Sequence, residues 1–140
     1  MNRAILTGSV IVGFAVMLSM SMMPAHAGLS TEIDIKPGSD TNPINLTSKG
    51  VIPVAILGSA FFDASSVDVS TLDFEGAAPT HNAGGHLVDV NNDGFLDLVS
   101  HYRTQETGIT EGQTEACLTG DTFAGEPLDG CDDITTVPTD

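Results

Sequence analysis

Oxygen-bearing side chains recur at alternate positions in the stretch DVNNDGFLDLV, which runs from Asp89 to Val99. Counted from Asp89 as position 1, they stand at positions 1, 3, 5 and 9, and a glycine stands at position 6. These residues are Asp89, Asn91, Asp93, Asp97 and Gly94. Ca²⁺ takes about 6–8 oxygen ligands, and this spacing turns alternate side chains of a tight loop toward one centre. The stretch therefore predicts a calcium site, with the backbone carbonyl of Phe95 as a further ligand and its ring packed inward.

A plain hairpin turn is the alternative interpretation of this stretch, since Asn92, Asp93 and Gly94 alone suffice for one. Such a turn would leave Asp89 and Asp97 as unpaired like charges, so we favour calcium. Mg²⁺ fits less well, because its small octahedral shell retains water. We expect a dissociation constant in the weak extracellular range, about 10⁻⁴ to 10⁻³ M.

The stretch departs from an EF-hand, because Ser100 stands at position 12 in place of the bidentate glutamate and strand-like sequences flank the loop. As a strand–loop–strand it resembles the calcium loops of FG-GAP repeats, the blades of integrin-type propellers, with the pattern D-x-D/N-x-D-G-x-x-D. That resemblance implies five ligands, which are Asp89, Asn91, Asp93, Phe95 and Asp97. It does not imply a propeller, since one such unit is present and propellers need several.

The wider chain also resembles a known kind of domain. Its stretches IDIKPGSDTNPINLTSKGVIPVAILGS, LVDVNNDGFLDLVSHYRTQETGI, TEACLTG and DGCDD are similar to a largely uncharacterised module of bacterial secreted and surface proteins. The resemblance covers nearly all of residues 31–137. It implies an exported β-rich domain and names no activity.

Residues 1–27 have the three-part layout of a secretory signal peptide. Arg3 lies near the start, an apolar run follows, and Ala25 and Ala27 precede the expected cut. The strictly apolar run, residues 10–18, is shorter than the roughly 20 residues that span a bilayer. We therefore expect export with cleavage after Ala27, one domain over residues 28–137, and a frayed tail over residues 138–140.

The exported part is strongly acidic. The chain has 19 acidic residues and a formal net charge of −15, and every acidic residue follows Ala27. Only Lys36, Lys49 and Arg103 oppose them there. Such a surface repels nucleic acid and anionic membranes, so neither is an expected partner, and no membrane span is expected after cleavage. Bound metal would neutralise part of the charge.

The two cysteines of the chain, Cys117 and Cys131, both lie in the exported part. An even number of cysteines outside the cytoplasm favours a disulfide. The entropic model gives about 3 kcal/mol for closing a loop of this size. A thiol metal site or a catalytic cysteine is less favoured, because no histidine or basic residue lies close in sequence. We predict a structural disulfide.

Short apolar or alternating runs, separated by Gly, Pro, Asn and Asp, predict strands, and no long run has helical periodicity. We expect strands at 31–36, 51–57, 67–75, 86–90, 95–102, 114–120 and 131–137. The strand at 67–75 needs a register shift near Ser70, and Pro53 favours an edge strand or a bulge. Residues 59–66 predict a helical turn with Phe61 and Phe62 in the core. The expected fold is all-β, an antiparallel Ig-like β-sandwich of about seven strands.

Three histidines follow the expected cleavage site, which are His81, His86 and His101. In a hairpin closed by the 89–97 loop, His86 and His101 would lie near each other across two strands. A transition-metal pair would require both side chains on one face. Ordinary surface or half-buried histidines are the favoured interpretation.

We expect no enzymatic activity. The clustered aspartates belong to the loop, and no serine stands in a nucleophile-elbow motif. Ser100 and His101 are adjacent in a predicted strand, so their side chains should point to opposite faces.

The expected function is a calcium-binding structural or adhesive module, secreted by a bacterium or held on its surface. Ca²⁺ would rigidify the 89–97 strand–loop–strand. One alternative is a carbohydrate-binding module that takes a glycan, which the absence of Trp and the single Tyr disfavour. Another is a subunit of an extracellular assembly built by strand addition, with an extracellular protein or further copies of the chain as a homo-oligomer.

Overall fold

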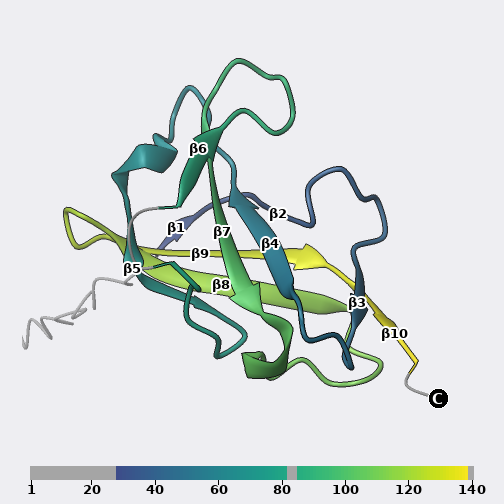
Figure 1. Ribbon diagram of the computed structural model, residues 1–140. Coiled ribbons are helices and arrows are strands. Elements are labelled where there is room, and N and C mark those ends of the chain that lie inside the picture. Colours follow the sequence, from purple (N-terminus) through teal and green to yellow (C-terminus); the bar gives the residue numbers. More distant parts are fainter. Residues whose placement is uncertain (1–27, 82–84, 139–140) are drawn as a thin grey trace, which may run out of the picture.

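The computed structural model describes residues 28–81 and 85–138. In this part the chain forms ten strands and two short 3₁₀ turns, so the predicted all-β class is confirmed (Figure 1). The expected signal peptide, residues 1–27, and the last two residues of the expected tail lie outside the described residues. Among the described residues, no helical segment has the length and apolarity that a membrane crossing requires.

Most strands belong to two four-stranded sheets. The first has the order β1-β9-β8-β5, formed by Leu29–Ser30, Pro127–Asp133, Glu115–Thr122 and Val67–Phe74. The second has the order β2-β4-β7-β6, formed by Ile33–Ile35, Val51–Ile56, Asp97–Arg103 and His86–Val88. A third pair joins β3 (Pro43–Asn45) and β10 (Thr135–Val137). Pairing is antiparallel except in β1–β9 and β10–β3.

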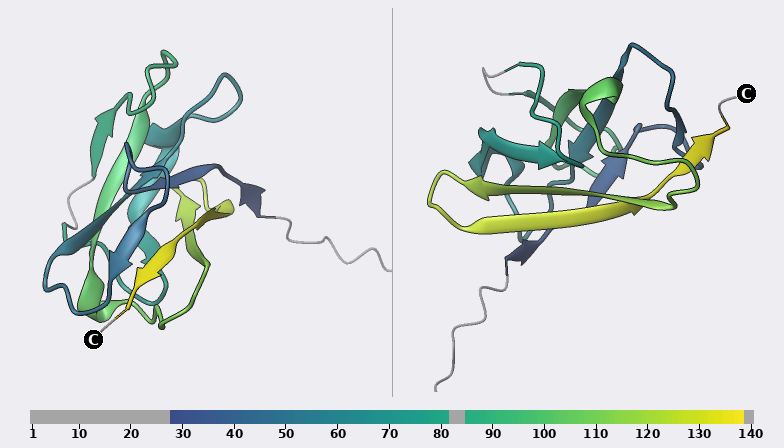
Figure 2. Two further views of the ribbon diagram at one scale, coloured as in Figure 1. Left: turned by 90° about the vertical axis from the view of Figure 1, so that its right-hand side faces the viewer. Right: turned by 90° about the horizontal axis from the view of Figure 1, so that it is seen from below.

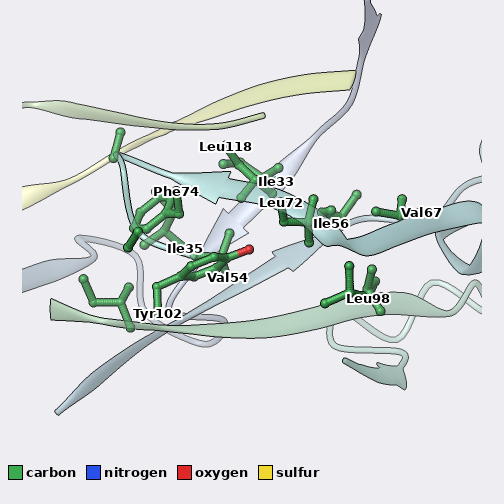
Figure 3. Packing of buried hydrophobic residues seen from close by; sticks show 14 of the residues in the cluster. Ile33, Ile35, Val54, Ile56, Val67, Leu72, Phe74, Leu98, Tyr102 and Leu118 are labelled. Atoms are coloured by element: carbon green, nitrogen blue, oxygen red, sulfur yellow. The ribbon is translucent and has the colours of Figure 1, made fainter. Parts of the chain in front are cut away.

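The two four-stranded sheets lie against each other (Figure 2) and bury one shared cluster of apolar side chains (Figure 3). Ile35, Val54 and Tyr102 come from the β2-β4-β7-β6 sheet, and Phe74 and Leu118 come from the other. The rings of Phe74 and Tyr102 meet with centroids 5.2 Å apart. Burial of these apolar surfaces is the main term that holds the sheets together.

Strand β5 contains the register shift that its sequence predicts. Its pairing with β8 is interrupted between Asp68 and Asp73. The four buried apolar residues of the strand are Val67, Val69, Leu72 and Phe74. Strict alternation would send the first two and the last two to opposite faces. The shift brings all four into the core, so this prediction is confirmed.

Pro53 does not lie on an edge strand, since β4 pairs with β2 on one side and β7 on the other. The edge prediction is therefore wrong. Lys36, just past the end of β2, donates its N–H to the carbonyl of Pro53 at 2.8 Å. The N–H that proline lacks would point to the same side as that carbonyl, where β2 has already ended. The central strand thus tolerates proline without losing a bond to β7.

The 3₁₀ turn η1 (Ala64–Ser66) confirms a helical turn within residues 59–66. Phe61, however, is 99% exposed, whereas Phe62 packs against the core. Phe61 was expected in the core, and that prediction is wrong. Ser59 and Phe62 form an isolated antiparallel bridge, which leaves Phe61 at the tip of a tight turn.

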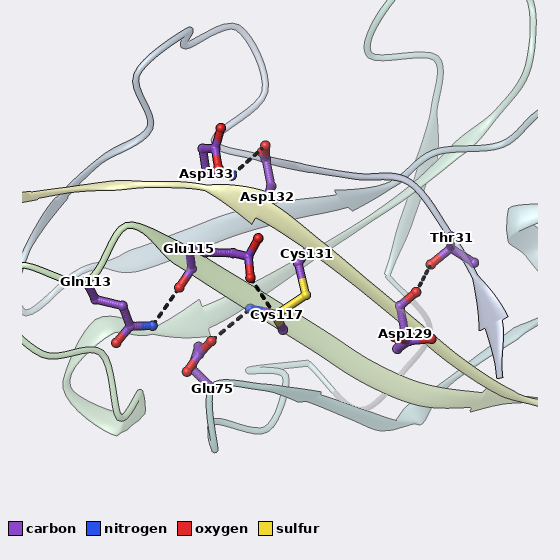
Figure 4. The surroundings of a disulfide bond; sticks show 9 residues. All are labelled: Thr31, Glu75, Gln113, Glu115, Cys117, Asp129, Cys131, Asp132 and Asp133. Atoms are coloured by element: carbon purple, nitrogen blue, oxygen red, sulfur yellow. Dashed lines mark hydrogen bonds between the residues drawn. A yellow bond between two sulfur atoms is a disulfide. The ribbon is translucent and has the colours of Figure 1, made fainter. Parts of the chain in front are cut away.

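The predicted disulfide between Cys117 and Cys131 is confirmed (Figure 4). The two cysteines are directly opposite each other on β8 and β9. Glu75 adds a link to the β5 side, because its Oε1 accepts the N–H of Cys117 at 2.8 Å. The bridge therefore crosslinks a hairpin in the first sheet, as a structural disulfide does.

Tyr102 is the only tyrosine of the chain, and it is fully buried. Its hydroxyl lies 2.8 Å from that of Ser100. Burial raises the pKa of Tyr102 to about 12, the Ser100 hydrogen bond opposes that rise, and Asp73 adds to it.

We expect alkaline titration of the native protein, followed by the tyrosinate ultraviolet band, to give a midpoint near pH 12. In urea the midpoint should fall to about 10. Because folding raises this pKa, its contribution to stability is complete below pH 10 and is lost as the pH rises from about 10 to 12. A native midpoint near 10 would contradict the buried phenol. The absence of Trp and other Tyr leaves the band free of overlap.

Candidate calcium loop

The acidic stretch connects β6 to β7 and forms the loop at the top of Figure 1. The two strands pair antiparallel, and Val88 opposite Asp97 is the last pair before the loop. The predicted strand–loop–strand is therefore present. Gly94 has a φ of 91°, a left-handed conformation that favours glycine at this position.

Alternate side chains of the loop fold back onto its backbone. The Asp89 carboxylate accepts the N–H of Asp93 at 3.2 Å and that of Gly94 at 2.9 Å. Asn91 Oδ1 also accepts the Asp93 N–H, at 3.3 Å, and Asp93 Oδ1 accepts the N–H of Phe95 at 2.9 Å. These bonds gather the oxygens of positions 1, 3 and 5 around one short turn.

The same donors keep Asp89 ionised. The Gly94 N–H is the largest cause that lowers the pKa of the Asp89 carboxyl, and the N–H groups of Asp93, Asn92 and Asn91 add to it. A carboxylate that accepts several backbone donors favours its charged form. The first predicted ligand is thus held in the form that binds a cation.

Asp97 lies in a different environment from the other predicted ligands. It is completely buried at the start of β7. One carboxylate oxygen accepts the N–H of Gly58 and the other accepts the N–H of Val90, each at 2.8 Å. Asp97 therefore anchors the loop to the end of β4, a role that the sequence analysis missed. No local signal reveals it, because Gly58 is 39 positions away.

Gly58 is a point of close approach between the loop and the rest of the fold. A Cβ atom on Gly58 would lie 2.1 Å from the carbonyl oxygen of Leu96. Only glycine leaves room for the loop backbone to come this near. The Gly58–Asp97 hydrogen bond and the Gly58–Leu96 contact together fix the base of the loop.

The carboxylates of Asp89 and Asp97 are not left unpaired, which differs from the expectation for a plain turn. Asp89 and Asp97 both find backbone N–H donors, so a plain turn would not leave them unpaired. Within residues 28–81 and 85–138, the ligand atoms of Asp89, Asp93 and Asp97 do not all lie within 4.8 Å of one another. Ca²⁺ would have to draw these carboxylates closer together.

Phe95 occupies position 7, where its backbone carbonyl was predicted as a ligand and its ring was expected to pack inward. The side chain is 41% exposed, and that of Leu96 is 56% exposed. The inward packing of the ring is therefore wrong. The loop instead carries two apolar side chains on its outer surface.

One group of three ligand-type side chains in the described part of the chain does cluster within 4.8 Å, namely Glu115, Cys117 and Cys131. The two sulfurs are bonded to each other in the disulfide. Metal coordination needs thiolates, so this cluster does not form a thiolate site.

The three histidines lie near one another beside the same hairpin. His81, His86 and His101 line a pocket of about 240 Å³ together with Pro79 and Val99. Burial lowers the pKa of His101, and the nearby charges of His86 and His81 lower it further. Ser100 faces the core, as alternation predicted, so it does not pair with His101.

Comparison with known proteins found no family model, no curated protein and no solved structure that matches the chain. The site therefore rests on its own residues.

Proposed function

We propose that the protein is a calcium-binding structural or adhesive module, exported and then secreted or held at the cell surface. Its fold would be an Ig-like β-sandwich, and Ca²⁺ would rigidify residues 89–97. The observation that carries this proposal is the folding of the Asp89, Asn91 and Asp93 side chains around one turn. Each has lone pairs left for a cation, because a carboxylate oxygen or an amide oxygen accepts more than one partner.

Asp97 is a proposed ligand whose carboxylate already accepts two hydrogen bonds. Its two hydrogen bonds occupy about two of the roughly four lone-pair sites of a carboxylate. Because Asp97 is completely buried, its remaining sites would reach an ion only after the loop closes around it. With the Phe95 carbonyl and water, these groups supply the oxygen ligands that Ca²⁺ needs.

Export is supported by the oxidised Cys117–Cys131 pair, since disulfides persist outside the reducing cytoplasm. The Ig-like class is supported by two sheets that pack on one core. The carbohydrate-binding alternative is disfavoured, because the only tyrosine of the chain is buried and cannot form an aromatic surface platform for a sugar.

A calcium titration of thermal unfolding tests the proposal. At a Ca²⁺ concentration 100 times the dissociation constant, binding should add about 2.7 kcal/mol to the free energy of unfolding. That corresponds to a rise in Tm of about 10 °C. Asp93→Ala should abolish the rise, since Asp93 is exposed and contributes no buried contact.

Glu111→Ala is the matched control, because it removes one exposed negative charge outside the loop. It should keep the full response to Ca²⁺. Equal melting of the wild-type protein with Ca²⁺ and with chelator would refute the proposal and leave the plain turn.

An assembly built by strand addition is the second candidate, and one groove favours it. The groove has a volume of about 500 Å³ and is lined by residues of β5 and β6, including Val69 and Leu87. Strand β6 ends the order of its sheet, and Leu87 and Val88 are 45% and 46% exposed. Size measurement by light scattering, with and without Ca²⁺, would distinguish an assembly from a monomeric module.

A further inference from the structure

The histidine pocket is separate from the calcium loop in both its chemistry and its place on the hairpin. It is lined by Pro79, His81, Gly85, His86, Val99, Ser100 and His101. No carboxylate is among these residues, so the pocket offers nitrogen rather than oxygen ligands. Neutral imidazole suits Zn²⁺, Cu²⁺ and Ni²⁺, whereas Ca²⁺ prefers oxygen.

Strand register places two of the histidines on one face. His86 is paired with Val99 across β6 and β7, and His101 follows two positions after Val99. Residues two apart on a strand share a face, so His86 and His101 are diagonal neighbours on the side of β7 away from the core. The condition that the sequence analysis set for a metal pair is met.

The separation of the two rings fits joint coordination. The centroids of His86 and His101 are 6.1 Å apart and the rings are nearly perpendicular, at 75°. Two imidazoles on one tetrahedral Zn²⁺, with Zn–N bonds of about 2.1 Å, have ring centres roughly 5–6 Å apart. A small rotation of the side chains would bring one nitrogen of each ring to a common ion.

His81 completes the set from a neighbouring segment. Thr80 donates its N–H to the carbonyl of His101 at 2.9 Å, which holds the backbone next to His81 against β7. The ligand atoms of the three histidines do not all lie within 4.8 Å of one another, so His81 must rotate to bind. Its side chain is exposed and free to do so.

We propose that His86 and His101, with His81 as third donor, bind a divalent transition metal such as Zn²⁺ on the outer face of the β6–β7 hairpin. Three nitrogen donors leave a fourth position for water or for a ligand from a partner. The negative net charge of −15 favours cation binding in general. No lysine or arginine lines the pocket to oppose the ion.

Calorimetric titration of the full chain with Zn²⁺, prepared without a histidine tag and with Ca²⁺ absent, tests this proposal. We expect one equivalent to bind with saturable affinity. His86→Ala and His101→Ala should each weaken binding by at least about tenfold, and His81→Ala should weaken it as well. A Co²⁺ titration should give the visible absorption of a tetrahedral site, and the same variants should lose it.

Two controls separate this site from other sources of binding. The fourth histidine, His26, lies in the expected signal peptide, so neither His26→Ala in the full chain nor removal of residues 1–27 should change Zn²⁺ affinity. Asp93→Ala should remove the response to Ca²⁺ but not Zn²⁺ binding, so the two proposals fail independently. Wild-type affinity in both His86→Ala and His101→Ala would overturn the proposal, as would Zn²⁺ binding that only Asp93→Ala removes.

Discussion

Asp97→Ala should lower the free energy of unfolding by about 3 to 4 kcal/mol in chelator, and by more in saturating Ca²⁺, because Asp97 is also a proposed ligand of the ion. The substitution removes the acceptor of two backbone N–H groups, those of Gly58 and Val90. Each donor that loses its partner away from water costs about 1–3 kcal/mol. Urea denaturation in chelator and in Ca²⁺ measures the effect.

Asp93→Ala is the matched variant for Asp97→Ala, because it removes an exposed carboxylate of the same loop. Asp93 is exposed, so its removal should cost little stability in chelator and should abolish the calcium response. Asp97 is fully buried, so its removal should cost stability in both solutions. If Asp97→Ala were as stable as wild type in chelator, the anchor role would be wrong, and Asp97 would act through the ion alone.

Gly58→Ala should lower the free energy of unfolding by about 3 kcal/mol. The added methyl would lie 2.1 Å from the carbonyl oxygen of Leu96, which belongs to the backbone and cannot rotate away. Overpacking in a tight site costs about 1–3 kcal/mol and occasionally more. The strain should also lengthen the Gly58–Asp97 hydrogen bond, which amide hydrogen exchange at residue 58 would report.

Gly50→Ala is the matched control for that substitution. Its added methyl would meet the Ser48 hydroxyl oxygen at 3.2 Å, and this side chain can move aside, since water can replace its exposed hydrogen bond from the Gly50 N–H. We expect a change below about 0.5 kcal/mol. Equal stability of Gly58→Ala and Gly50→Ala in chemical denaturation would contradict the close approach of the loop to Gly58.

Local patterns predicted the parts of the fold that depend on neighbouring residues. The broken alternation around Ser70 predicted the register shift of β5, because one face must collect all of its apolar side chains. The Asp89 to Asp97 spacing predicted a loop between two strands, and the loop is there. Two cysteines in the part of the chain that is expected to be exported predicted their disulfide, which is present.

Tertiary contacts decided the features that the sequence did not reveal. The acidic pattern treats Asp97 as one ligand among several, but a partner 39 positions away makes it a buried anchor. Proline at position 53 predicted an edge strand, but β4 is a central strand. Pro53 is tolerated there because β2 ends before the position where the missing N–H would need a partner. The apolar side chain of Phe61 was expected in the core, but the bridge between Ser59 and Phe62 forms a tight turn that exposes Phe61 to solvent.

The Gly58–Asp97 hydrogen bond also connects the acidic loop to the turn that follows β4. The turn that follows Gly58 presents Phe61, which is 99% exposed. Asp97 holds the start of this turn through its 2.8 Å hydrogen bond from the Gly58 N–H, and the Leu96 backbone lies close to Gly58 as well. A shift of the acidic hairpin that moves Asp97 would therefore move this turn. If the loop binds Ca²⁺ as proposed, the ion would thereby also change how firmly the turn that exposes Phe61 is held.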